Sequence, residues 1–73
     1  MFGYVKKDKL LDDIREEIDF CRRMIDMLEP IIEALRRDNA SSMTIEFHQR
    51  SLKEWELRLD QSQRILNILK FAK

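Results

Sequence analysis

The sequence predicts an all-α protein: a two-helix antiparallel coiled-coil hairpin that assembles as a homodimeric four-helix bundle. Three observations indicate this fold class. Apolar residues recur at spacings of three and four along two long segments, a short polar segment separates them, and the 73 residues include one Gly and one Pro. Few turns can be built from so few turn-forming residues. A chain of this length forms at most one small domain, so we expect residues 1–73 to be a single helical-hairpin domain.

The first helix is expected over about residues 8–37, after an arm at about 1–7 whose Phe2 and Tyr4 close the open end of the bundle. Asp8 is a candidate N-cap for this helix. An unbroken heptad of positions a and d then follows: Leu11, Ile14, Ile18, Cys21, Ile25, Leu28, Ile32 and Leu35.

Pro30 lies inside this helix, where it removes one backbone hydrogen bond. Either the helix has a kink near Pro30, or it ends near Leu28 and a short third helix starts at Pro30. The heptad phase continues through the proline, which falls at the outward position f. The sequence therefore favours a kink that preserves the phase.

The turn is expected at about 38–42 and the second helix at about 43–72, since residues 37–42 concentrate side chains that favour caps and turns. Ser41, Ser42 or Thr44 can cap the second helix, and the sequence does not choose among them. The heptad of this helix consists of Ile45, His48, Leu52, Trp55, Leu59, Ser62, Leu66 and Leu69.

A turn this short makes the two helices antiparallel. Their a and d residues then pair about one midpoint, Ala40, which lies inside the expected turn. Leu35 faces Ile45 next to the turn, and Leu11 faces Leu69 at the open end. We call these two facing heptads the seam.

Further apolar residues lie outside the seam, at positions g and c of the first helix and on the corresponding side of the second. In an antiparallel pair g faces g, so both sets lie on one side of the hairpin, while the opposite side is charged. We call them the apolar flank, the candidate self-association or partner interface: Leu10, Phe20, Met24, Met27, Ile31, Phe47, Ile65, Ile68 and Phe71. Such a strip exceeds what an ordinary monomer exposes, and a second copy that covers it would give a four-helix bundle.

Residues that could carry chemistry have structural interpretations that fit better. His48 occupies a seam position without a Glu-x-x-His or His-x-x-x-His spacing, so we expect a partly buried, hydrogen-bonded histidine and no metal ligand. Cys21 is expected to be a buried structural thiol. The acidic residues of the first helix are interspersed with arginines, as in a solvated face. The sequence thus predicts no catalytic residue, no metal site, no cofactor and no enzymatic activity.

The function that the sequence favours is a non-catalytic, self-associating interaction module that binds another macromolecule, such as an adaptor, an inhibitor or a small regulator of the kind that phages and prophages encode. In its plan of two long helices in a short chain, the protein resembles the Rop family of plasmid copy-number regulators, without a shared motif. That resemblance implies an alternative, a bundle that binds RNA, although fourteen basic and fourteen acidic residues cancel. A further alternative is an oligomer that binds a small ligand through His48, Trp55 and Arg58.

The expected partners are a second copy, with a dimer favoured, and a protein that docks on the apolar flank; nucleic acid and membrane are not favoured. No apolar run approaches the roughly 20 residues that span a bilayer. The start of the chain does not read as a secretory signal, and Cys21 is unpaired. We therefore expect a cytoplasmic protein.

Overall fold

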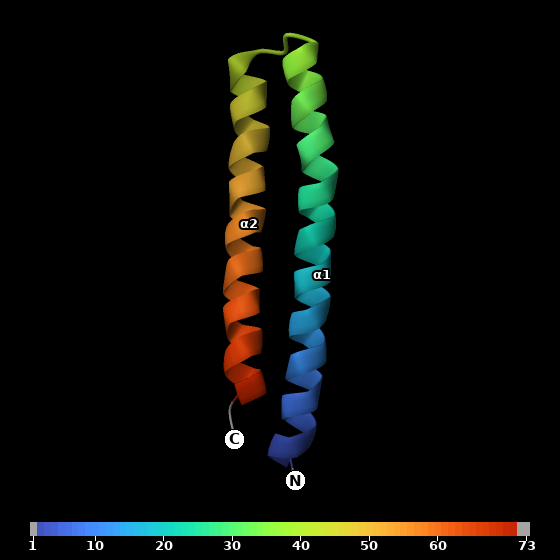
Figure 1. Cartoon of the computed structure of the whole chain (residues 1–73), viewed down its shortest axis with the longest axis vertical. Coiled ribbons are helices and arrows are strands. Elements are labelled where there is room, and N and C mark those ends of the chain that lie inside the picture. The colour runs from blue at the N-terminus through green and yellow to red at the C-terminus, as the bar shows by residue number, and fades with distance from the viewer. Residues whose placement is uncertain (1, 72–73) are drawn as a thin grey trace.

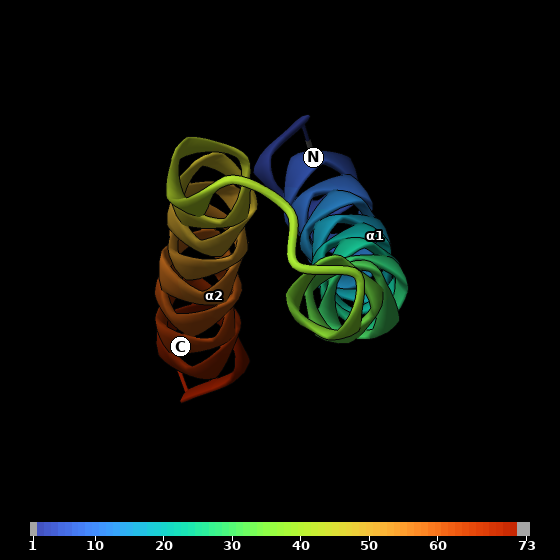
Figure 2. The same ribbon diagram turned by 90° about the horizontal axis from the view of Figure 1, so that it is seen from above.

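A computed structural model describes residues 2–71 of the chain, with side chains described for 7–71. Helix α1 spans Phe2–Arg37 and helix α2 spans Ser42–Phe71, and the two pack against each other. Figure 1 shows them side by side, running in opposite directions and joined at one end. Viewed from above, the connecting segment crosses directly from one helix to the other (Figure 2). The predicted all-α hairpin is confirmed.

The amino-terminal arm is the part of the prediction that differs from the structure. α1 begins at Phe2, well before Asp8, so Asp8 lies within the helix and is not its N-cap. Residues 2–7 contain no proline, and the single Gly3 costs about 1 kcal/mol in a helix, which is too little to stop one. The predicted contacts of Phe2 and Tyr4 fall on side chains outside the described residues.

α1 runs through Pro30 as one helix. Leu28 and Ile32, on either side of the proline, are both buried, while Pro30 is exposed. The heptad phase is therefore preserved, and the alternative of a third helix that starts at Pro30 is wrong. The kink itself stays a prediction.

The end of α1 is a Schellman motif. The amide of Ala40 donates to the Leu35 carbonyl at 2.9 Å, and the amide of Asn39 donates to the Arg36 carbonyl at 3.2 Å. Asn39 has a φ of 55°, the left-handed conformation that this motif requires and that Asn tolerates better than most residues. The turn therefore follows from one residue with a positive φ.

Ser41 is the residue that caps α2, among the three candidates. Its hydroxyl accepts a hydrogen bond from the Thr44 amide at 3.2 Å and lies 2.8 Å from the Thr44 hydroxyl. The Ser41 carbonyl accepts the first bond of the new helix, from the Ile45 amide at 3.1 Å. The Schellman bonds and the Ser41 cap thus provide partners for some of the backbone groups that each helix end leaves unpaired.

The core is the predicted seam. Ile18, Cys21, Leu28 and Ile32 of α1 are buried, as is Ser62 of α2. All the remaining seam residues are half-buried. Because two helices can cover only one side of each other, the fold is a rod with extents of 57 × 15 × 14 Å and a narrow core.

Candidate interaction surface

The apolar flank remains largely exposed in the folded hairpin. Phe71, Ile68 and Phe47 are 83%, 68% and 66% exposed, and Ile31, the most covered of the exposed members, is still 38% exposed. Met24 is the one half-buried member. The other exposed members are Leu10, Phe20, Met27 and Ile65. Helix packing within one chain therefore leaves these side chains in contact with solvent.

The two helices contribute to the flank at different levels of the rod. α1 supplies a run in its middle, from Phe20 to Ile31, and α2 supplies Phe47 near the turn and Ile65 to Phe71 near the open end. Between these two groups the g and c positions of α2 are polar or charged. Along the length of the rod, the apolar run of α1 thus lies beside the polar g and c positions of α2.

Phe20 is anchored at the edge of the seam by an aromatic contact. Its ring meets that of Trp55 edge to face, with centroids 5.4 Å apart and an interplanar angle of 68°. The guanidinium of Arg58 lies 4.7 Å from the centroid of the Trp55 ring, in cation–π geometry. Trp55 therefore joins an apolar residue of α1 to a charged residue of α2.

Arg58 also forms an ion pair with Glu17 across the two helices. Both residues occupy g positions, which face each other in the predicted register, so the pair and the Phe20–Trp55 contact both fit that register. The sequence places Glu17 among the acidic residues of a solvated face, and this expectation is wrong for Glu17, which is half-buried and paired across the two helices. Pairing each g residue of α1 with the g residue that faces it on α2 would identify the contact of Glu17 with Arg58 from the sequence.

Cys21 is completely buried beneath this ion pair. Its thiol donates a long hydrogen bond to the Glu17 carboxylate, with 3.8 Å between Sγ and Oε1. Burial raises the pKa of the Cys21 thiol, and the Glu17 carboxylate raises it further by repelling a thiolate, whereas Arg58 acts in the opposite direction. The expected burial of this thiol is confirmed, and burial favours its protonated form.

His48 is half-buried and bonded to its own helix. Its Nδ1 donates to the Thr44 carbonyl at 2.9 Å, and its ring meets the Phe47 ring edge to face at 5.5 Å. The expected hydrogen-bonded histidine is confirmed. Of the three residues considered for a small ligand, the structure brings together Arg58 and Trp55, while His48 contacts its neighbours near the turn.

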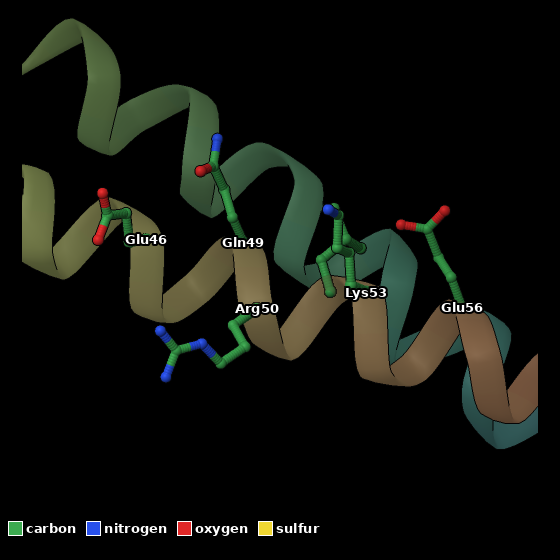
Figure 3. A pocket seen from close by; sticks show the side chains of 6 residues that line it. Glu46, Gln49, Arg50, Lys53 and Glu56 are labelled. Carbon is green, nitrogen blue, oxygen red and sulfur yellow. The ribbon is translucent and has the colours of Figure 1, made fainter.

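The opposite side of the hairpin is a surface of mixed charge. A shallow groove of about 550 Å³ is lined by Glu46, Gln49, Arg50, Leu52, Lys53 and Glu56. Figure 3 shows these polar side chains extending from α2 in different directions, with Arg50 pointing away from Gln49. Ligand sites have a few polar groups that converge on one point, and this groove does not have that arrangement.

Three arginines that could contact the phosphates of RNA have acidic neighbours. Arg15 pairs with Asp12 at 3.7 Å, Arg64 pairs with Asp60 at 3.1 Å, and Arg58 pairs with Glu17. These carboxylates neutralise part of the positive charge locally.

Within the part of the chain that the structure describes, no three His, Cys, Asp or Glu side chains gather as they would to hold a metal ion. Over residues 2–71, neither helix contains an apolar stretch suited to crossing a membrane. Comparison of the chain with models of protein families, with curated proteins and with solved structures found no match.

Proposed function

We propose that the chain is a non-catalytic, self-associating helical interaction module, which pairs with a second copy through the apolar flank and acts by binding another macromolecule. An adaptor, an inhibitor or a small regulator would work in this way. One observation supports the proposal above all: a hairpin whose seam is already formed still exposes nearly the whole apolar flank on one side.

The area of the hairpin supports association. Its accessible surface is 6150 Å² for a mass of 8.9 kDa, whereas a compact monomer of that mass exposes roughly 4,800 Å². The difference is larger than the roughly 800 Å² that each partner contributes to a stable interface. A second copy on the flank would remove this excess and complete a four-helix bundle.

The chemistry of the flank supports binding as the activity. Phenylalanine, leucine, isoleucine and methionine side chains stabilise complexes by leaving water, at about 25 cal/mol per Å² of buried apolar surface. The methionines add adaptability, because an unbranched thioether can pack against varied partners. The free, buried thiol of Cys21 fits a reducing compartment, which supports a cytoplasmic location.

The test introduces one carboxylate on each side of the hairpin. Met27→Glu places a charge in the flank, and Asn67→Glu places the same charge on an exposed position of the opposite side. Sedimentation equilibrium should give a dimer for the wild type and for Asn67→Glu, and a monomer for Met27→Glu. Circular dichroism checks that both variants remain helical.

A wild-type chain that is monomeric at every concentration would contradict the proposal. So would Met27→Glu and Asn67→Glu variants that dimerise equally well, because the contact would then lie outside the flank.

A further inference from the structure

The exposed apolar run of α1 has a spacing that is symmetric end to end. Phe20, Met24, Met27 and Ile31 are separated by four, three and four residues and alternate between positions c and g. A two-fold interface requires such symmetry, because residue i contacts the partner's residue j while j contacts the partner's i. The run can therefore pair with its own copy in antiparallel orientation, about a midpoint between Met24 and Met27.

In this pairing every contact of the run is apolar. Phe20 meets the partner's Ile31, and Met24 meets the partner's Met27, with a g position facing a c position each time. In the seam between α1 and α2, an a position likewise faces a d position, as antiparallel helices require. The contacts of Glu17 with Arg58 and of Phe20 with Trp55 fit the register of that seam.

The g and c positions of α2 from Phe47 to Ile65 are also complementary to their own copy. About a midpoint at residue 56, Phe47 meets the partner's Ile65 and Glu54 meets the partner's Arg58. The pair between them joins Ser51 to the partner's Gln61. In these three pairs an apolar residue meets an apolar residue, neutral polar residues meet each other, and an acid meets a base that also pairs with Glu17 of its own chain. In the fourth pair, Thr44 meets the partner's Ile68. The meeting of Glu54 with Arg58 is the charge complementarity expected of a specific contact.

One axis serves both helices. In the register of the hairpin, residue 56 of α2 lies at the level of residue 24 of α1, and the midpoint of the α1 run lies between residues 25 and 26. A helix rises 1.5 Å per residue, so the two midpoints differ in level by about 2 Å. The pairings of α1 and α2 involve different residues, and they place the two-fold axis at nearly the same height.

From this agreement we infer that the occupant of the apolar flank is a second copy of the chain, docked about a two-fold axis perpendicular to the helices, with α1 antiparallel to the partner's α1 and α2 antiparallel to the partner's α2. The inference rests on the proposed function and adds the geometry of the pair. The surface that a hairpin exposes beyond a compact monomer of its mass is enough for this contact.

The other two-fold arrangement fits the residues less well. An axis parallel to the helices would place α1 against the partner's α2 at the same level. The apolar run of α1 would then face Ser51, Glu54, Arg58 and Gln61, and the Glu54 carboxylate would lose water against apolar side chains. The complementarity of the flank thus selects the perpendicular axis.

Disulfide cross-linking tests the geometry directly, in a Cys21→Ala background that leaves no other thiol. An equimolar mixture of Phe20→Cys and Ile31→Cys chains should form a covalent dimer under mild oxidation. Each variant alone should not, because like positions lie eleven residues apart, roughly 16 Å along the axis, beyond the reach of a disulfide. Phe47→Cys with Ile65→Cys should behave in the same way for α2.

The matched control is a mixture of Met27→Cys with Ser51→Cys, a c and a g position at about the same level of the rod, which meet only if the axis is parallel to the helices. If this mixture cross-links and the Phe20→Cys with Ile31→Cys mixture does not, the geometry is wrong while self-association stands. If no mixture cross-links and the chain sediments as a monomer, both the geometry and the proposed function are wrong.

A charge exchange at Glu54 and Arg58 gives a second test, without cysteines. Glu54→Arg chains place arginine against the partner's Arg58, and Arg58→Glu chains place glutamate against the partner's Glu54, so each homodimer is weakened. In a mixture, both contacts of the heterodimer join opposite charges. Native mass spectrometry should therefore find more heterodimer than random mixing gives, and a random proportion would overturn the predicted contact.

Discussion

Neighbouring residues of α1 differ sharply in their environment, because the helix buries one narrow stripe. Leu28 is buried in the seam, whereas Met27 beside it is half exposed to solvent on the flank. The contribution of a side chain to folding should therefore depend on its heptad position more than on its hydrophobicity.

Leu28→Ala should lower the free energy of unfolding by about 2–5 kcal/mol, since it removes buried volume from a core only two helices thick. Arg22→Ala, on the exposed charged side, should change it by less than about 1 kcal/mol. Urea denaturation at one fixed protein concentration measures both. Equal losses for the two variants would mean that the seam has another register.

Cys21 gives a pH dependence that can be isolated by mutation. Burial and the nearby Glu17 carboxylate raise the pKa of the folded thiol above its ordinary value of 9.0. Its contribution to stability is fully present below the pKa of the unfolded thiol and is lost as pH rises towards the folded pKa. The difference in unfolding free energy between wild type and Cys21→Ala should therefore shrink in the alkaline range, and a constant difference would contradict the assignment.

The turn depends on a backbone conformation, which makes Asn39 its most sensitive position. The left-handed φ of 55° has a higher conformational free energy for alanine than for glycine or asparagine. Asn39→Ala should lose about 1 kcal/mol of unfolding free energy, while Asn39→Gly should match or exceed the wild type. Thermal unfolding distinguishes the two, and equal stability of both variants would exclude the Schellman turn.

Pro30 lies on the exposed side of α1, where it destabilises the helix locally. Pro30→Ala should raise the free energy of unfolding by about 1–3 kcal/mol, because it restores a helical hydrogen bond and relieves the clash with the preceding turn. Glu33→Ala, another exposed position of the same helix, is the control and should change stability little. A destabilised Pro30→Ala variant would mean that the proline has a role in packing.

The two helices, their direction and their seam could be predicted from the sequence because each depends on a repeated signal. Eight facing pairs share one midpoint, so the predicted register does not depend on the assignment of any single residue. The start of α1 could not be predicted, since a residue such as Asp8 can cap a helix or lie within it. The contact of Arg58 with Glu17 and Trp55 depends on side-chain rotamers across two helices, which heptad positions alone do not fix.

At the scale of the molecule, the hairpin is a rod 57 Å long whose seam uses only one side of each helix. The apolar flank lies beside that seam, so the same heptad geometry that forms the hairpin also places a second apolar surface next to it. Association of two rods through this surface would produce a bundle with a continuous core, in which the side chains of the flank take positions equivalent to those of the seam.

The mass of the wild-type chain in solution tests the central claim most directly. Light scattering over a wide range of concentration should give twice the 8.9 kDa of one chain. A dimer that persists on dilution would place the flank inside a permanent bundle and leave the charged outer faces to bind another macromolecule. A mass of one chain throughout would contradict self-association and would mean that the flank stays open for a different partner.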